Sequence, residues 1–373
     1  MPKLSEIFTL QMGKTPARAK NEYWNNGDND WVSISDLSTY DKYVGETKET
    51  ISDLAVMESG IKPAPADTVI MSFKLSLGKT AITVKPTYTN EAIMAFIPNG
   101  NYPVHTSYFY HFFVGYDWSN GTNRAVMGST LNKATLSEIE ITVPSIMEQI
   151  EIAKCLDKID ALISLRKQQL SKLDELVKSR FIEMFGDRYT NDKKWDNKPL
   201  CECADFYNGK AHEQVVDENG EYILVTSRCI ASDISDYRRT NTLLFPLQVN
   251  DIAMVMSDVP NGRALAKCIL INEDGKYTLN QRICCLRNYS FNPIFFYHLL
   301  NRHEYFLSFN DGNAQTNLRK DDLLACNIII PPMKLQEQFA AFVEQTDKSK
   351  IEIQKSLAKL ETLKKALMQQ YFG

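Results

Sequence analysis

The sequence predicts an α+β protein made of two similar strand-rich units and two long helices. Three observations support this fold class. The second half of the chain repeats the first half. Two segments of roughly 40 residues carry apolar residues at the four-three spacing of coiled-coil helices. The remaining sequence contains short β-type runs separated by clusters of Gly, Asn, Asp and Pro, which are typical of strands and turns.

The composition of the 373-residue chain is that of an ordinary globular protein, with 44% hydrophobic and 24% charged residues. This excludes a disordered or collagen-like chain. No run of ~18 apolar residues is present, so we expect no membrane helix. The start of the chain lacks the apolar core of a secretory signal. Eight scattered cysteines without a C-x-x-C pair are typical of reduced thiols in a cytoplasmic protein. The net charge of −4 argues mildly against nucleic acid as a partner.

The repeat is clearest toward the end of each copy. A shift of 187 residues aligns Pro144 with Pro331, Gln149 with Gln336, Asp160 with Asp347, Phe109-Tyr110-His111 with Phe296-Tyr297-His298, and Phe185-Gly186 with Phe372-Gly373. Nearer the start the register changes, and Gly13-Lys14 matches Gly209-Lys210 at a shift of 196. The repeat predicts two globular regions and two helices, in the order 1–144, 145–186, 187–332 and 333–373.

Each predicted helix has an apolar stripe along one side. We assign the following residues to helix packing: Ile152, Leu156, Ile159, Leu170, Leu173, Phe339, Val343, Leu357 and Leu360. Thr346, Lys350 and Lys364 interrupt the second stripe. Ser145 and Glu148 have the spacing of a capping box, so the first helix should begin there. Gly186 is placed to end it with a left-handed cap.

Each apolar stripe needs a partner, which is either its own globular unit or the other helix. At ~1.5 Å per residue each helix is about 60 Å long. A domain of ~140 residues has a radius of gyration near ~15 Å, which is too small to cover such a helix. This favours pairing of the two helices as an antiparallel coiled coil about a pseudo-two-fold axis.

Strands are predicted at matching places in the two globular regions. Those of the first are Trp31–Ser35, Thr68–Met71 and Ala81–Val84, with counterparts at Tyr222–Val225, Ile252–Val255 and Ile283–Leu286. Aromatic-rich segments around 101–113 and 292–306 predict short helices.

Catalytic motifs are incomplete. Gly13-Lys14-Thr15 and Gly78-Lys79-Thr80 both lack the first glycine that a phosphate loop needs. Asn292-Pro293-Ile294-Phe295 resembles the N-P-P-[F/Y] motif of amino-methyltransferases but lacks its second proline, and no glycine-rich loop follows a strand. No zinc spacing is present. We therefore expect a protein that is not an enzyme and holds no metal or cofactor.

Two similar units at a fixed spacing suit a bivalent ligand such as DNA with two half-sites. Lysine, arginine and small polar residues in loops can contact phosphates or bases, although an ordinary solvated surface is the alternative for each. Our candidates for DNA contact are Lys14, Thr15, Arg18, Lys20, Ser76, Lys79, Arg124, Lys133, Lys210, Arg228, Asn261, Arg263, Arg282, Arg319 and Lys320.

Several segments then resemble one known family in its own order. Gly13-Lys14-Thr15-Pro16, Tyr23–Gly27 and Trp31–Leu37 resemble the opening of a target-recognition domain in the specificity subunits of type I restriction-modification systems. Val143–Asp160 and Pro331–Ala340 each resemble the spacer helix of that family. The second unit departs from the pattern, because Gly209-Lys210-Ala211-His212 lacks Thr-Pro and no Tyr-Trp follows.

The resemblance implies a non-catalytic subunit with two target-recognition domains, each binding one half of a split, asymmetric double-stranded DNA sequence. It implies that the helices set the spacing and dock two methyltransferase subunits, with restriction subunits outside. Methyl donor, ATP and magnesium would belong to those partners. Two alternatives remain open. One is the same module serving a fused restriction-methylation polypeptide, and the other is a coiled-coil scaffold that binds no DNA.

Overall fold

The computed structural model describes residues 1–74, 76–118, 123–125, 128–258, 264–310 and 316–372. The chain forms two compact units, and each long helix contributes to both. Unit 1 consists of Met1–Lys167 and Lys355–Gly373, and unit 2 of Gln168–Gln354. The helix α6 (Ile146–Phe185) therefore begins in unit 1 and ends in unit 2, and α11 (Met333–Phe372) does the reverse.

The elements that precede α6 all belong to unit 1. In chain order they are α1 (Leu4–Ile7), β1 (Phe8–Met12), the 3-10 helix η1 (Asn21–Tyr23), β2 (Trp24–Val32), α2 (Ile34–Leu37), β3 (Glu49–Ile51), α3 (Asp53–Ser59), β4 (Val69–Ser72), β5 (Thr80–Ile82), β6 (Tyr88–Thr89), β7 (Ile93–Pro98), α4 (Thr106–Gly115), β8 (Asn123–Ala125), β9 (Gly128–Thr130) and α5 (Lys133–Ser137).

The elements between the two long helices all belong to unit 2. In chain order they are β10 (Asn197–Pro199), η2 (Leu200–Glu202), β11 (Asp205–Asn208), η3 (Glu213–Val215), β12 (Tyr222–Val225), α7 (Ser227–Ala231), β13 (Arg238–Thr240), β14 (Ile252–Val255), β15 (Ser257–Asp258), β16 (Cys268–Leu270), β17 (Tyr277–Leu279), β18 (Ile283–Arg287), α8 (Pro293–Leu300), α9 (Glu304–Leu307), β19 (Thr316–Asn317), α10 (Lys320–Leu324) and β20 (Asn327–Ile329).

The two units have the same sheet topology, which confirms the α+β class and the internal repeat. Each contains a four-stranded antiparallel sheet, in the order β1-β7-β4-β5 in unit 1 and β11-β18-β14-β16 in unit 2. Each also contains a three-stranded sheet, β3-β2-β6 or β13-β12-β17. In both three-stranded sheets the central strand pairs antiparallel with one neighbour and parallel with the other.

Two details of the predicted strands were wrong. The strands predicted at 81–84 and 283–286 are not counterparts. The second is β18, and its counterpart in unit 1 is β7, because both lie second in their sheets. The first is β5, and its counterpart in unit 2 is β16. The strand at Trp31 ends at Val32, and Ile34 already begins α2. Ser33 stops the strand because its N–H donates to Asp36 Oδ2 at 3.0 Å and its Oγ accepts from the Asp36 N–H at 3.1 Å.

The predicted ends of α6 are confirmed. Ser145 Oγ accepts from the Glu148 N–H at 3.4 Å, and the Ser145 N–H donates to Glu148 Oε2 at 2.9 Å, which completes the capping box. Gly186 has a φ of +78°, and its N–H donates to the Ile182 carbonyl at 2.8 Å. Glycine tolerates this left-handed conformation without a steric penalty.

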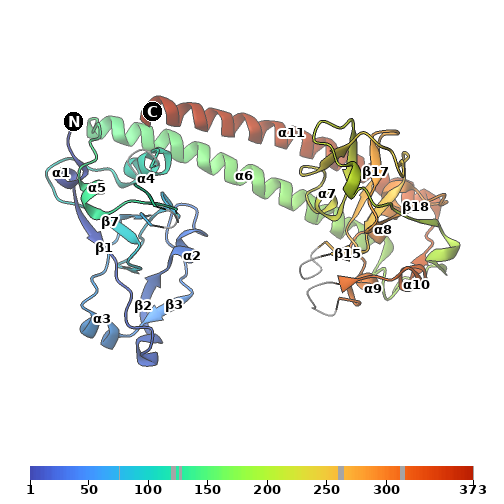
Figure 1. Ribbon diagram of the computed structural model, residues 1–373, viewed down its shortest axis with the longest axis horizontal. Coiled ribbons are helices and arrows are strands. Elements are labelled where there is room, and N and C mark those ends of the chain that lie inside the picture. The colour runs from blue at the N-terminus through green and yellow to red at the C-terminus, as the bar shows by residue number, and fades with distance from the viewer. Residues whose placement is uncertain (75, 119–122, 126–127, 259–263, 311–315, 373) are drawn as a thin grey trace. The chain divides into compact units, whose positions relative to one another are not determined.

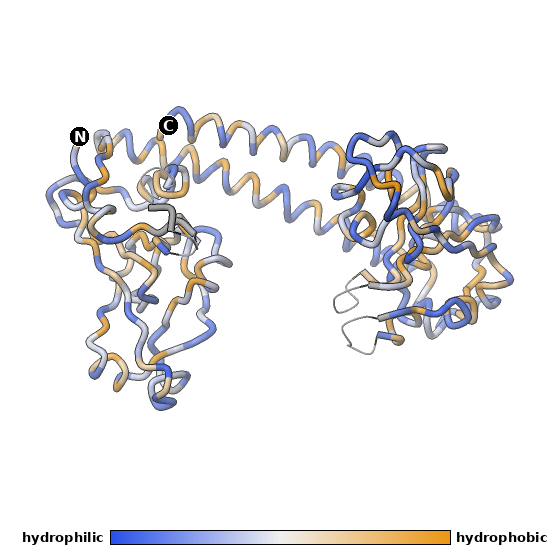
Figure 2. The backbone as a smooth tube through the Cα atoms, in the orientation of Figure 1, coloured by the Kyte–Doolittle hydropathy of each residue, from blue (hydrophilic) through white to orange (hydrophobic). Residues whose placement is uncertain are grey.

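The two long helices run antiparallel within each unit. In unit 1 Lys364 pairs with Asp160 at 2.6 Å, and in unit 2 Lys350 pairs with Asp174 at 2.8 Å. The lysines that interrupt the apolar stripe of α11 therefore bind carboxylates of α6. Apolar and polar residues alternate along both helices (Figure 2). Leu156, Ile159, Phe339 and Val343 are buried, whereas Ile152, Leu170, Leu173, Leu357 and Leu360 are half-buried.

Both packing partners considered for the helices are used. In unit 1 Ala153 of α6 is buried in the same core as the aromatic residues of α4, and Phe372 at the end of α11 lies 5.5 Å from Tyr108 of α4 between ring centroids. The start of α6 and the end of α11 lie beside α4 (Figure 1). In unit 2 Phe339 of α11 and Phe185 at the end of α6 are buried, 5.6 Å apart. Each unit is therefore completed by the final turns of the helix that begins in the other.

Candidate nucleic-acid interface

One edge of each four-stranded sheet brings together loops that are distant in the sequence. In unit 1, β1 and β4 end at this edge and β5 and β7 begin there, because Met12 pairs with Met94, and Ser72 with Ile93. In unit 2, β11 and β14 end at the corresponding edge and β16 and β18 begin there. We call these the loop edges of the two sheets.

Several predicted DNA-contact residues lie at the loop edges. Those of unit 1 are Lys14 and Thr15 after β1, and Ser76 and Lys79 between β4 and β5. Those of unit 2 are Lys210 after β11, Arg282 before β18, and Arg319 after Leu318, whose N–H donates to the Met256 carbonyl at 2.7 Å. All of these candidates are exposed except Thr15, which is half-buried. Lys133 and Lys320 begin the short helices α5 and α10 and are also exposed.

Three other candidates are paired with carboxylates of their own unit. The Arg18 guanidinium binds Glu49 through two nitrogens at 2.5 and 3.0 Å. Lys20 lies 2.6 Å from Glu58, and Arg228 lies 2.5 Å from Asp236. The hydrogen bond from Lys20, together with one from Tyr23, lowers the pKa of Glu58, which keeps that pair charged. These pairs neutralise the charge that a phosphate contact would need.

The remaining candidates cannot be placed as side chains. Arg124 lies in β8, where only the backbone is described. Asn261 and Arg263 lie outside the described residues.

The repeated Gly-Lys pair has a structural explanation. The N–H of Gly13 donates to the Ile93 carbonyl and that of Gly209 to the Ile283 carbonyl, both at 3.0 Å. A Cβ atom on Gly13 would lie 2.2 Å from the Thr89 carbonyl oxygen, and one on Gly209 would lie 2.0 Å from that of Asn280. Only glycine permits this close approach, which presents the following lysine at the same point of both loop edges.

In unit 1 two tryptophans fix the loop after β1. Trp31 Nε1 donates to the Lys14 carbonyl at 3.0 Å, and Trp24 Nε1 donates to the Ala17 carbonyl at 3.3 Å. The rings pack edge to face, 5.0 Å apart, and the Arg18 guanidinium lies 3.7 Å above Trp24. The aromatic residues that carry the family resemblance therefore shape the backbone around Lys14.

In unit 2 a histidine takes over this role. His212 is fully buried, and its Nδ1 lies 2.6 Å from the Lys210 carbonyl, which corresponds to that of Lys14. Because a carbonyl can only accept, Nδ1 carries the proton, and Nε2 lies 3.0 Å from Thr278 Oγ1. The missing Thr-Pro and Tyr-Trp of unit 2 are thus compensated by a different side chain that supports the same carbonyl.

A further part of each loop edge is a turn in which only Arg282 was predicted from the sequence. The turn between β6 and β7 (90–92) matches the turn between β17 and β18 (280–282) at a shift of 190, which aligns Asn90 with Asn280. The N–H groups of these asparagines donate to the carbonyls of Val32 and Val225 at 3.0 and 3.1 Å. The signal was present in the repeated Asn-x-x-Ile, but loops of different length shift its register.

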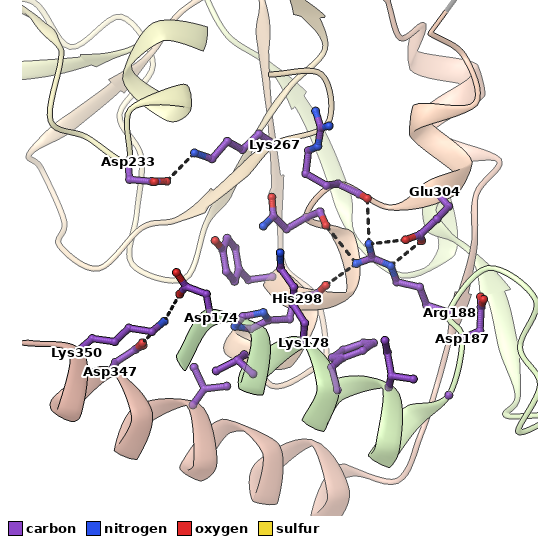
Figure 3. Close-up of a pocket in the computed structure, with 18 residues that line it drawn as sticks. Asp174, Lys178, Asp187, Arg188, Asp233, Lys267, His298, Glu304, Asp347 and Lys350 are labelled. Carbon is purple, nitrogen blue, oxygen red and sulfur yellow. Dashed lines mark hydrogen bonds and ion pairs between the residues drawn. The ribbon is translucent and has the colours of Figure 1, made fainter. Parts of the chain in front are cut away.

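A separate pocket of about 770 Å³ lies in unit 2 among the end of α6, α8 and the start of α11 (Figure 3). Most of its charged side chains bind each other: Lys350 pairs with Asp174 and Asp347, Lys267 with Asp233, and Arg188 with Glu304. Burial, with the nearby charge of Lys350, lowers the pKa of His298 to about 4, so its ring is neutral near pH 7.

Two other kinds of feature are absent from the described part of the chain. Its His, Cys, Asp and Glu side chains form no group of three or more that could hold a metal ion. Its helices include none that combines the length and apolar content needed to cross a membrane. The eight cysteines are all described and all free.

The duplicated α+β unit, with one equivalent loop edge in each copy, defines a protein with two related candidate binding surfaces. The sequence model of one protein family, the type I restriction modification DNA specificity domain, matches this chain twice, at residues 1–175 and 192–365. The chain therefore belongs to the family of type I restriction-modification specificity subunits.

Individual relatives agree with this assignment. The specificity subunit of the type I restriction enzyme MjaIX from Methanocaldococcus jannaschii is 26% identical over 412 residues, covering 98% of this chain and 90% of the relative. The specificity subunit of EcoR124I/EcoR124II from Escherichia coli is 31% identical over 186 residues, covering 48% of this chain and 45% of the relative.

Solved structures show the same fold. The S subunit of a type I system from M. genitalium has a TM-score of 0.55 at 13% identity, covering 100% of this chain and 95% of that one. A chain from a structure describing assembly of the type I R-M system has a TM-score of 0.59 at 14% identity, covering 99% and 96%.

Proposed function

We propose that each unit of this chain binds one half of a bipartite double-stranded DNA target through its loop edge. The observation that carries the proposal is the clustering, at equivalent edges of both sheets, of exposed lysines and arginines that form no ion pair with the rest of the described chain: Lys14, Lys79, Lys210, Arg282 and Arg319. The Lys14 ammonium donates to the Ser59 carbonyl of its own unit. The other four have no side-chain hydrogen bond to a described residue and can bind phosphates and base edges. We take 1–144 and 187–332 as the recognition regions.

The net charge of −4 does not oppose this function. The acidic residues paired with Arg18, Lys20 and Arg228 neutralise these three basic groups within their own units. Lys79, Lys210, Arg282 and Arg319 at the loop edges form no ion pair with the described residues. A local basic surface, rather than the overall charge, determines where the phosphate backbone binds.

The target should be asymmetric, because the two units share a backbone arrangement but differ in side chains. Lys14 is followed by Thr15 in unit 1, whereas Lys210 is followed by Ala211 in unit 2. The same groove position would therefore meet different hydrogen-bonding groups in the two half-sites.

We assign the spacing of the half-sites and the docking of two methyltransferase subunits to α6 and α11, with restriction subunits joining outside. Large apolar side chains remain exposed on both helices: Met147 (63%), Leu165 (53%) and Ile182 (60%) on α6, and Ile351 (49%) and Leu363 (48%) on α11. Exposed apolar residues along an ordered helix are typical of a protein interface. Catalysis, with methyl donor, ATP and magnesium, belongs to the partner subunits in this proposal.

The test is co-expression of the full chain with the methyltransferase encoded beside it, followed by sequencing of the methylated genome. We expect one split, asymmetric methylated motif. A continuous palindromic motif, or no methylation by a complex that assembles, would contradict the proposal.

A matched pair of variants tests the loop edge itself. Lys79→Ala removes an unpaired ammonium, and we expect it to weaken binding of all duplexes and to reduce the slope of log affinity against log salt by about 1. Lys20→Ala removes an ammonium already paired with Glu58, so its effect on that slope should be much smaller. Equal effects would place the interface elsewhere.

A further inference from the structure

We propose that the turns 90–92 and 280–282 contact bases directly, with Glu91 recognising a cytosine in one half-site and Arg282 a guanine in the other. This inference rests on the proposed function and assigns the bases that it leaves open. At these turns the two units have the same backbone hydrogen bonds and different side chains.

The backbone of the two turns is held by the same set of hydrogen bonds. The Ala92 carbonyl accepts from the Phe73 N–H at 3.0 Å, and the Arg282 carbonyl accepts from the Met256 N–H at 3.2 Å. Each turn also closes on itself, since the Ile93 N–H donates to the Asn90 carbonyl at 3.0 Å. The corresponding bond from Ile283 to Asn280 measures 3.1 Å. Side chains at matching positions of the two turns therefore project from equivalent points of the backbone.

Both turns touch the loop that carries the repeated lysine. In unit 1 Thr15 Oγ1 donates to Glu91 and accepts from Asn90 Nδ2 at 3.1 Å. In unit 2 Gln281 Nε2 donates to Glu213 Oε1 at 2.8 Å. The turn and the lysine loop thus form one surface in each unit.

The repeat separates two kinds of contact at this surface. Phosphates are the same in every sequence, so a phosphate contact can be kept in both units, as Lys14 and Lys210 are. A base contact must change when the half-sites differ. The second and third residues of the turns do change, from Glu91-Ala92 to Gln281-Arg282.

The exposed carboxylate of Glu91 matches the hydrogen-bonding group of one base. Its carboxylate is exposed and binds Thr15, and no lysine or arginine of the described chain contacts it. The acids Glu49, Glu58 and Asp236, by contrast, each neutralise a basic side chain. An unpaired carboxylate at a phosphate-binding surface is repelled by DNA unless it accepts from an amino group. The N4 amino group of cytosine, in the major groove, is the partner that glutamate recognises.

Arg282 has the complementary chemistry. Its guanidinium is exposed and has no hydrogen bond or ion pair with the described residues. Ala92 occupies its position in unit 1, so the fold does not require a cation there. Arginine matches O6 and N7 of guanine with two parallel hydrogen bonds.

The experiment uses the full chain in complex with its methyltransferase and compares the methylated motif of wild type with those of three variants. Glu91→Gln should change the preferred base from cytosine to adenine at one position of one half-site. Arg282→Lys keeps the charge and should lower discrimination for a guanine in the other half-site roughly 10- to 100-fold. The double variant Q281E/R282A gives unit 2 the turn sequence of unit 1 and should add an amino-bearing base to its preference.

The controls separate the possible outcomes. Lys79→Ala should weaken all sequences alike and leave the motif unchanged. Competition between duplexes that differ by one base pair, measured on the purified complexes, gives the preference even where a variant methylates poorly. An unchanged motif in Arg282→Lys would make this residue a phosphate contact, and changes in both half-sites would make the turns structural; either result overturns the inference. Absence of any split motif with wild type would instead overturn the proposed function.

Discussion

Units 1 and 2 support the same carbonyl with unrelated side chains. Trp31 donates to the Lys14 carbonyl from a neighbouring strand, whereas His212 donates to the Lys210 carbonyl from two residues further along the same loop. The surrounding backbone hydrogen bonds join equivalent residues in the two units, as in the bonds from Gly13 to Ile93 and from Gly209 to Ile283, both 3.0 Å. The difference teaches that the position of the lysine is maintained in this duplication, while the means of holding it is not.

The two glutamines that the repeat aligns show the opposite behaviour. Gln149 Oε1 accepts from the His105 N–H at 2.8 Å, and Gln336 Oε1 accepts from the Asn292 N–H at 2.9 Å. Their Nε2 atoms donate to the carbonyls of Pro144 and Pro331. Both glutamines are buried, and each fixes the start of a long helix to the start of α4 or α8. At these two positions both the side chain and its hydrogen-bonding geometry are the same in the two units.

The largest expected difference between the units concerns the ends of the long helices. Phe185 is fully buried in unit 2, whereas Phe372 is half-buried in unit 1. Phe185→Ala should therefore lower the free energy of unfolding of unit 2 by about 3–5 kcal/mol, and Phe372→Ala should lower that of unit 1 by about half as much. Hydrogen exchange measured peptide by peptide separates the two units. Equal losses would show that the two helix ends are equivalent.

A second difference should appear on acidification. Burial, together with Arg188, lowers the pKa of His303 in unit 2 to about 4, against an ordinary value near 6.5. Between these values the unfolded chain binds a proton that the folded unit refuses, so stability is lost as pH falls from 7 toward 4. The loss is on the order of 3 kcal/mol for this fully buried ring.

Unit 1 should be less sensitive to acid in this range. Burial lowers the pKa of His111, but Asp157, 2.6 Å from its Nε2, opposes the shift. Melting followed at pH 7.5 and 5 tests the contrast. His303→Asn removes one of the two unit 2 rings whose pKa is lowered to about 4, the other being His298, and should reduce the acid sensitivity of unit 2. Parallel loss of both units would contradict it.

A smaller effect is expected from the paired glutamines. Gln149→Leu removes three hydrogen bonds and leaves the Pro103 carbonyl without that donor, while Gln336→Leu removes two. Loss of buried partners costs about 1–3 kcal/mol, and Gln149→Leu should lie at the upper end. Urea denaturation provides the measurement. A larger loss in free energy of unfolding for Gln336→Leu than for Gln149→Leu would contradict this expectation.

The smallest effect concerns the two supports of the lysine loops. Trp31→Phe and His212→Phe each delete one donor to a carbonyl, worth about 1 kcal/mol. Each should weaken recognition of only its own half-site. Competition with duplexes altered in one half-site measures this, and Trp195→Phe, whose indole donates to the Phe185 carbonyl at the end of α6 at 2.9 Å, serves as the control for loss of a tryptophan.

Features encoded locally could be predicted from the sequence, and features made by distant partners could not. The start of α6 follows from Ser145 and Glu148, three residues apart, and its end from Gly186. The sequence predicts Arg18 as a DNA contact, but in the structure its guanidinium binds Glu49, which is 31 residues away in the chain. The turn at Asn90 and the role of His212 depend on hydrogen bonds with other strands, and the repeated Asn-x-x-Ile of the turns is out of register with the 187-residue shift.

The division of the long helices also determines the order in which the chain can fold during synthesis. Unit 2 is a single continuous stretch, Gln168–Gln354, whereas unit 1 needs Lys355–Gly373 as well as the first 167 residues. At about 5–20 residues per second, the ribosome takes roughly 10–40 s between these two parts of unit 1. The N-terminal unit is therefore the last to be completed, because Phe372 packs against Tyr108 and Phe112 of α4 only after the whole of α11 has been synthesised.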